Sequence, residues 1–304
     1  MEVDGSWIKP HKVDVLEVAS GQRYGTLIHT KPRAEVMHTV DGIRSSLQGC
    51  YWIRIESPWR TAATNGWFLL RYPGAQGCVP GRYVPPTKNN SLALIPPSCF
   101  GWVSQALEPL AGDNGQPRRS VPTDDQVARR LIIKTQQTYR DEHNKEIVWR
   151  EAGVFYNESA HARAPILIQL FQGLTERPSY ERAMSNQIRQ GWDEVSQTYV
   201  AKAGEVLDIV IVNEPSSLSS QVELHPWHFH GLKFWHLASG VGTFSDAALA
   251  EVRSKGYRNP ILRDTVVVWP EPGSSLNASD KLLPTQSGGW TALRYEVSRD
   301  EAGV

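Results

Sequence analysis

The chain has 304 residues, of which 40% are hydrophobic and 21% are charged. This composition is typical of a folded globular protein, and the length is sufficient for two domains. Lys and Arg together number 32, as do Asp and Glu, so the formal net charge is zero. Proteins that follow a phosphate backbone need a basic excess, so we expect no nucleic-acid partner. The longest apolar runs are far shorter than the roughly 18 residues of a membrane span, so we expect no membrane partner.

The first third of the chain has the alternating pattern of β-strands. In residues 49–57, Tyr51, Ile53 and Ile55 share one face, and polar or aromatic residues occupy the other. Residues 12–19 and 66–72 are predicted to be neighbouring strands. The segment that follows is rich in Pro, Gly and Asn and predicts a connection between two domains. We therefore divide the chain into residues 1–85, 86–125 and 126–304.

The last of these parts has many short strand patterns with turn residues between them, which indicates an all-β sandwich or barrel. The predicted strands are residues 129–139, 147–157, 164–173, 204–213, 224–238, 261–269 and 289–297. Two short helices are predicted, at residues 179–189 and 245–255. The second begins at a capping Ser and ends at Gly256.

Cysteines and glycosylation signals give weaker information about the environment of the protein. The cysteines are Cys50, Cys78 and Cys99, and the odd count leaves at least one thiol unpaired or bonded to another molecule. Three Asn-X-Ser sequons would suit a secreted glycoprotein. The first residues have neither a basic nor an apolar signal-peptide region, so we expect no signal peptide there. The sequence leaves the location of the protein open.

Four of the nine histidines, His225, His228, His230 and His236, lie within twelve residues. Imidazole is the commonest metal ligand, and it suits copper, zinc and iron. On a strand, residues two apart share a face at roughly 7 Å, and an odd offset changes the face. We therefore expect His228 and His230 to serve neighbouring metals and His225 to serve a different metal on the other side. Such a strand would connect a mononuclear and a multinuclear centre, which suits electron transfer.

The segment His225-Pro-Trp-His228-Phe-His230-Gly231 resembles the HPxHxHG motif in the third cupredoxin domain of multicopper oxidases of the laccase and ascorbate-oxidase type. In that family the three histidines bind the type 1, type 2 and type 3 coppers, in that order. The resemblance implies copper as the cofactor and His225, His228 and His230 as metal ligands in these respective roles. It also implies that His225 is the catalytic residue through which electrons enter.

The resemblance extends along most of the chain. Residues 13–24, which end in Gly-Gln-Arg-Tyr, resemble a strand of the family's second domain, and residues 259–270 and 288–295 resemble strands that follow the histidine motif. It implies tandem cupredoxin-like Greek-key barrels, both incomplete. Residues 1–85 would be a partial second domain, 86–125 a connection, and 126–304 a third domain without its C-terminal copper segment. The implied activity is one-electron oxidation of phenolic or similar small donors, coupled to reduction of O2 to water. Fungal-type relatives often use this activity in secondary metabolism.

The departures from the family pattern are equally informative. Apart from His228-Phe-His230-Gly231 itself, this sequence has no HWHG-type or HxH pair of the kind that the first domain supplies, and the C-terminal HCHxxxH segment does not occur. None of the three cysteines is flanked by His, so none can replace the type 1 thiolate. One alternative is a catalytically inactive relative that acts as a binding or interaction protein. Others are a split oxidase in which a second chain supplies the missing ligands, and a reading frame that is incomplete as written.

Near the motif, Arg263 and Asp264 are expected to form an ion pair within one strand.

Overall fold

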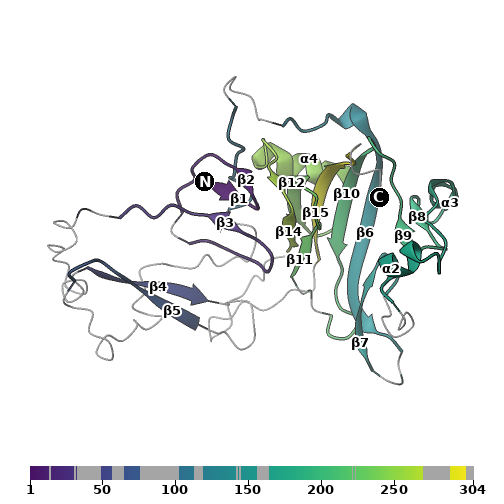
Figure 1. The fold of residues 1–304 in the computed structure, drawn as a ribbon, viewed down its shortest axis with the longest axis horizontal. Coiled ribbons are helices and arrows are strands. Elements are labelled where there is room, and N and C mark those ends of the chain that lie inside the picture. The colour runs from purple at the N-terminus through teal and green to yellow at the C-terminus, as the bar shows by residue number, and fades with distance from the viewer. Residues whose placement is uncertain are drawn as a thin grey trace.

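The described part of the molecule is mostly β, as expected from the sequence, and its largest unit is a curved six-stranded sheet (Figure 1). The computed structural model describes residues 1–13, 15–30, 32, 49–56, 65–75, 103–112, 119–141, 143, 145–155, 164–220, 222, 224–269 and 288–298. Within these residues, no helix is long and apolar enough to cross a membrane. The three sequons, Cys78, Cys99 and most of the predicted connection lie outside the described residues. The proposed division into three parts therefore stays a prediction.

The six-stranded sheet has the order β13-β12-β15-β10-β6-β7. Its strands are β6 (Val127–Tyr139), β7 (Ile147–Glu151), β10 (Val206–Asn213), β12 (Phe234–Val241), β13 (Leu262–Arg263) and β15 (Gly289–Glu296). Strands β6 and β10 are parallel, and the other neighbours are antiparallel. The central strand β10 reads as an almost continuous apolar run because both of its faces are covered.

One face of this sheet packs against a second, two-stranded sheet. That sheet pairs β11 (His225–His228) with β14 (Thr265–Val268) in antiparallel register. The core between the two sheets is built from side chains of β6, β10, β12, β14 and β15, with Phe234, Val268 and Leu293 fully buried. This sandwich arrangement places β11, which carries His225 and His228, against the inner face of the larger sheet.

The other face of the large sheet is covered by helix α4 (Asp246–Lys255). The helix starts where the Ser245 hydroxyl accepts a hydrogen bond from the backbone N–H of Ala248, and it ends at Gly256. Its core-facing residue Leu249 packs with the buried aromatic side chains of Trp235 and Trp290. Both ends of this helix were predicted correctly from the capping residues.

The N-terminal part forms two small sheets, seen at the left of Figure 1. The first consists of β1 (Glu2–Val3), β2 (Ser6–Trp7) and β3 (Tyr24–Gly25), in the order β2-β1-β3. The second is an antiparallel hairpin of β4 (Cys50–Glu56) and β5 (Asn65–Arg71), as the alternating pattern predicted. A small core that contains Val3, Val103 and Ile261 joins the first of these sheets to the residues just before β13.

Two predicted strands are wrong. Residues 164–173 form helix α2 (Ile166–Phe171), which is followed by Gly173 in a left-handed conformation with φ of +69°. A short apolar run has no periodicity that separates a strand from one and a half helical turns. Residues 12–19 contain no strand in their described part. The predicted strand 224–238 is instead two strands, β11 and β12, separated by Gly231 with φ of +72°.

Three short elements complete the described fold on the side of β6. They are α3 (Tyr180–Ser185), which lies within a predicted helix, and the paired strands β8 (Trp192–Asp193) and β9 (Thr198–Tyr199). Ser179 caps α3, and Asp193 accepts hydrogen bonds from the Ser179 backbone and the Arg182 side chain. These bonds fix the loop after α3, and Arg129 of β6 donates a hydrogen bond to the backbone oxygen of Val200, which follows β9.

Candidate metal centre

The three motif histidines project from the two faces of one short chain segment. The His225 ring packs edge-to-face against Trp149 of β7, with the ring centroids 4.0 Å apart. Trp227 and Phe229 point in the same direction, into the core between the sheets. His228 and His230 point the other way, and both are exposed. The alternation that the sequence predicted therefore holds in the structure, although it does not test the proposed roles.

His228 and His230 lie next to each other. Their ring centroids are 4.9 Å apart, with an angle of 66° between the ring planes. The rings are closer than the roughly 7 Å spacing of alternate positions on a straight strand, because β11 ends at His228 and the chain turns at Gly231. The pair can thus contribute either to one shared ion or to two neighbouring ions.

The orientation of the His228 ring is fixed by Asp264, which lies between β13 and β14, and by Thr265, the first residue of β14. Its Nδ1 atom is 3.0 Å from the backbone oxygen of Asp264 and 3.0 Å from the hydroxyl oxygen of Thr265. The Thr265 hydroxyl donates its own proton to the Asp264 carboxylate at 2.9 Å, so it accepts from the ring. Nδ1 therefore carries the ring proton, and the lone pair of Nε2 stays available to a metal.

The register of β11 and β14 creates this arrangement, since it places His228 directly opposite Thr265. Sequence reasoning missed Thr265 because a single threonine in an apolar strand carries no signal of its own. Knowledge of which residue pairs with His228 across the two strands would have been needed to identify Thr265.

Asp264 connects His228 to the N-terminal part of the chain. Its carboxylate accepts two hydrogen bonds from the Arg23 guanidinium, at 2.7 and 2.5 Å. Burial pushes the pKa of Asp264 upward, but the hydrogen bonds from Arg23 and Thr265 outweigh this effect. The pKa lies below its ordinary value, so the carboxylate is ionised at neutral pH.

The expected ion pair between Arg263 and Asp264 is wrong. Arg263 points to the opposite side of the strand and pairs with Asp4 at 2.8 Å, and both side chains are fully buried. Arg263 also donates a hydrogen bond to the hydroxyl of Tyr24 at 3.3 Å. Arg23 and Tyr24 belong to the Gly-Gln-Arg-Tyr segment noted in the sequence, so this segment contacts both members of the Arg263-Asp264 dipeptide.

His236, the fourth histidine of the cluster, belongs to the core. Its Nε2 atom is 2.8 Å from the Ser239 hydroxyl, and its ring packs against Tyr257. Burial lowers the pKa of His236 to about 3, and repulsion by the nearby Arg263 acts in the same direction. The ring is therefore neutral at physiological pH and serves packing.

Among the residues that the structure describes, three imidazoles have the chemistry of copper ligands. Two neighbouring imidazoles, one with its Nε2 lone pair directed outward, fit copper, as does the separate imidazole of His225. Within the described ranges, no group of three or more His, Cys, Asp or Glu side chains is placed to hold one metal ion. Cys50 is the single described cysteine, and its sulfur is in a disulfide bond, so it does not act as a thiolate ligand.

A β-sandwich whose smaller sheet carries the HPxHxHG segment is the arrangement of a cupredoxin-like domain. The family model described as multicopper oxidase matches residues 161–291. Over 98% of this chain, the sequence is 32% identical to multicopper oxidase terE of Aspergillus terreus and covers 54% of that protein. The chain belongs to the multicopper oxidase family, whose members are copper oxidoreductases.

Two further relatives support this assignment. The laccase-like multicopper oxidase 1 of Thermothelomyces thermophilus is 30% identical over 98% of this chain, which spans 42% of that relative. The L-ascorbate oxidase of Nicotiana tabacum is 24% identical over the full chain, which spans 46% of that enzyme. The chain thus spans about half the length of the curated relatives it matches.

Proposed function

We propose that this chain contributes His225, His228 and His230 to the copper centres of a multicopper oxidase. The reaction would be one-electron oxidation of phenolic or similar small donors, coupled to reduction of O2 to water. Copper, when bound, supplies the one-electron redox chemistry. Family membership supports the reaction class, and the laccase-like and L-ascorbate oxidase relatives support small donors. Phenol coupling in secondary metabolism is the proposed setting.

The arrangement of β11 is the observation that carries this proposal. His225 lies on the face of the strand toward the large sheet, and His228 and His230 lie on the opposite face. We assign His225 the electron-entry role at the type 1 copper, where it is the catalytic residue. His228 and His230 would act as ligands of the type 2 and type 3 coppers. Only two residues of the chain then separate His225 from His228, which gives a short path for electrons.

The surroundings of these residues suit their proposed tasks. Trp149 shields one side of the His225 imidazole and limits the rotation of its ring. The Asp264 backbone oxygen and the Thr265 hydroxyl hold His228 in a single tautomer. A ligand that is oriented before the metal arrives loses less conformational entropy on binding.

The proposal is tested on the protein isolated from its own cells through an affinity tag, so that any partner chain is retained. Copper content and oxygen uptake with a diphenol are measured for the wild type and for His225→Ala. We expect a type 1 copper together with a trinuclear cluster, and oxygen uptake that His225→Ala abolishes. Isolated protein that lacks copper and consumes no oxygen would refute the oxidase proposal.

A second proposal is a catalytically inactive relative that acts as a binding or interaction protein. It is favoured by the incomplete ligand set within the described residues. A third case is a split oxidase, in which a second chain supplies the remaining ligands and this chain is inactive by itself. The same isolation separates them, because a split oxidase brings down a second chain with the full copper complement, and an inactive relative does not.

A further inference from the structure

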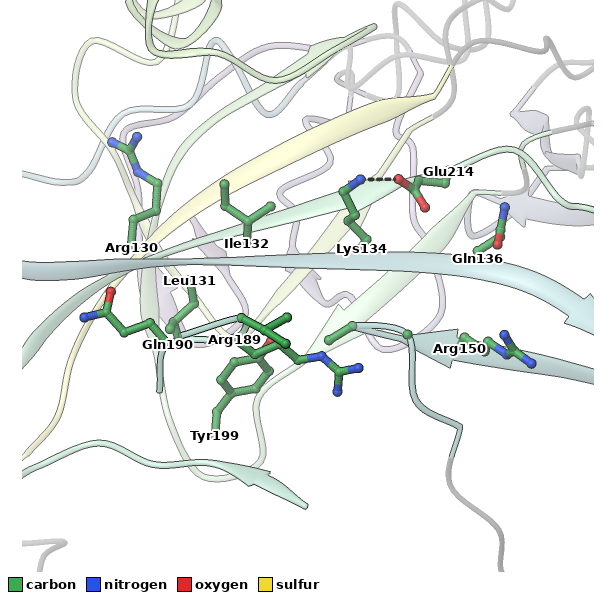
Figure 2. A pocket seen from close by; sticks show the side chains of 13 residues that line it. Arg130, Leu131, Ile132, Lys134, Gln136, Arg150, Arg189, Gln190, Tyr199 and Glu214 are labelled. Carbon is green, nitrogen blue, oxygen red and sulfur yellow. Dashed lines mark ion pairs between the residues drawn. The ribbon is translucent and has the colours of Figure 1, made fainter. Parts of the chain in front are cut away.

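A cavity of about 510 Å³ opens at the outer edge of strand β6, beside the loop that follows α3 (Figure 2). Its volume falls within the range of small-molecule sites in proteins. The charged and aromatic residues that line it are Arg130, Lys134, Arg150, Arg189, Tyr199 and Glu214. Four of these six side chains are cationic and one is anionic, so the lining has a basic excess that the whole chain does not have.

The cavity exists because β7 is shorter than β6. Strand β7 pairs only with Thr135–Tyr139 and then turns away through Ala152 and Gly153, both of which have positive φ. The outer edge of the earlier part of β6 therefore faces the loop that carries Ile188 and Arg189. A side chain at Gly153 would begin 3.5 Å from the Arg189 guanidinium, so this glycine keeps the approach to Arg189 open.

Two of the four cations are already compensated by carboxylates. Lys134 forms an ion pair with Glu214 at 2.8 Å, which Figure 2 marks as a dashed line. Arg130 pairs with Asp246 and lies 3.8 Å from Asp208. These two residues contribute little net charge to the cavity.

Arg150 and Arg189 are different, because neither forms an ion pair with any residue in the described ranges. The Nε atom of Arg150 is buried and has no hydrogen-bond partner among those residues. The guanidinium of Arg189 lies over the ring of Trp192, 5.8 Å from its centroid. Neither guanidinium therefore has a carboxylate partner among the described residues, and a charged group that lines a cavity is normally satisfied by an acceptor from solvent or from a ligand.

We infer that this cavity binds a small organic anion, an aromatic carboxylate, through Arg150 and Arg189. Guanidinium groups recognise the two oxygens of a carboxylate through paired N–H donors. The rest of the lining includes Ile132, Ile188 and the Tyr199 ring, which suit the body of such a molecule, together with the polar side chains of Gln136 and Gln190. This inference uses no residue of the candidate metal centre and does not depend on copper.

Isothermal titration with 2-naphthoate tests the inference, and 2-naphthylmethanol and inorganic phosphate serve as comparison probes. We expect the wild type to bind 2-naphthoate, to bind phosphate at least about tenfold more weakly, and to show no measurable binding of the neutral alcohol. Arg150→Gln and Arg189→Gln should each raise the Kd for 2-naphthoate at least about tenfold. Arg258→Gln is the matched control, since Arg258 is exposed and lies outside the cavity lining, and it should leave the Kd unchanged.

Circular dichroism of each variant establishes that it is folded. If Arg150→Gln does not fold, two measurements still decide the question. They are the binding of the neutral alcohol to the wild type and the binding of 2-naphthoate to Arg189→Gln. Binding of the alcohol as tight as that of 2-naphthoate would overturn the inference, because the guanidinium groups would then not be used. An unchanged Kd in Arg189→Gln, or tighter binding of phosphate than of 2-naphthoate, would overturn it as well.

Discussion

The Arg23 guanidinium and the Asp264 carboxylate are joined by two hydrogen bonds, of 2.7 and 2.5 Å, across 241 positions of the sequence. The backbone oxygen of the same aspartate accepts a hydrogen bond from Nδ1 of His228 at 3.0 Å. Asp264, the residue just before β14, therefore connects the N-terminal part of the chain to a proposed copper ligand. The position of the N-terminal part and the orientation of the His228 ring therefore both depend on Asp264.

Replacing Arg23 by Gln should lower the free energy of unfolding by about 1 kcal/mol. A charge-assisted pair of this kind contributes more when buried, but half of the Arg23 side chain is exposed, and solvent screens it. The measurement is urea denaturation at neutral pH. The control is Arg119→Gln, because Arg119 pairs with Glu296 where both side chains are about half exposed. Equal losses of unfolding free energy in the two variants would show that the Arg23–Asp264 pair stabilises the fold no more than an ordinary surface ion pair.

A larger effect is expected at the buried pair of Asp4 and Arg263. Asp4 has φ of +47°, a conformation that Asn also tolerates, so Asp4→Asn removes the charge with little change in backbone preference. The variant leaves the fully buried Arg263 guanidinium without its carboxylate. Loss of one partner of a buried pair costs about 3–5 kcal/mol, which urea denaturation measures directly.

A double variant provides the control for this interpretation. In Asp4→Asn with Arg263→Met, no uncompensated cation remains in the core. We expect the double variant to be less destabilised than the sum of the two single variants. Simple additivity would mean that the two side chains stabilise the fold independently.

The buried imidazole of His236 predicts a dependence of stability on pH. Its pKa is about 3 in the folded protein, compared with an ordinary value of 6.5, mainly because of burial. Below pH 6.5 the unfolded chain takes up a proton that the folded protein does not bind. The free energy of unfolding should therefore fall by up to about 1.4 kcal/mol for each pH unit between about 6.5 and 3. Urea denaturation at pH 7, 6 and 5 tests this expectation.

The variant His236→Gln isolates this contribution, because Gln can still hydrogen-bond to Ser239 but does not titrate. Carboxylates with lowered pKa values, such as Asp124 and Glu205, lose their contribution only at more acidic pH, so they do not interfere above pH 5. The change in the free energy of unfolding between pH 7 and pH 5 should be clearly smaller in this variant than in the wild type. An unchanged slope would assign the pH dependence to other groups.

The sequence predicted those features that depend on local pattern. Strand β10 and helix α4 followed from an apolar run and from capping residues, and the opposed faces of His225 and His228 followed from strand alternation. Features that depend on pairing between distant segments could not be obtained this way. Neither the Arg23–Asp264 contact nor the position of Thr265 opposite His228 has a local signature.

The error at Arg263 and Asp264 has a simple physical origin. Arg263 ends β13 and Asp264 lies between β13 and β14, and consecutive residues of an extended chain point to opposite sides, so these two side chains are poorly placed to pair. Each instead found a partner on its own side, Asp4 for Arg263 and Arg23 for Asp264. The alternation of side chains along an extended chain predicts the opposed faces of His225 and His228. The same rule argues against an ion pair between Arg263 and Asp264.

The last prediction concerns metal binding by the motif histidines. We expect Cu(II) to bind the purified chain at a site formed by His228 and His230, whose rings are 4.9 Å apart. His228→Ala and His230→Ala should each abolish this site, because one imidazole alone binds copper weakly. Thr265→Val should weaken it about tenfold, since the hydroxyl supports the His228 tautomer with Nε2 free. Titration followed by electron paramagnetic resonance measures both affinity and the number of nitrogen ligands.

The comparison with His225→Ala decides whether the two faces of β11 act separately. His225 packs against Trp149 on the opposite face, so its removal should leave the His228–His230 site intact. His29→Ala, a change at an exposed histidine outside the motif, controls for nonspecific copper binding. If His225→Ala and His228→Ala abolish the same single site to the same extent, the three histidines act together. The separation of roles along β11, and with it the proposed electron path, would then have to be abandoned.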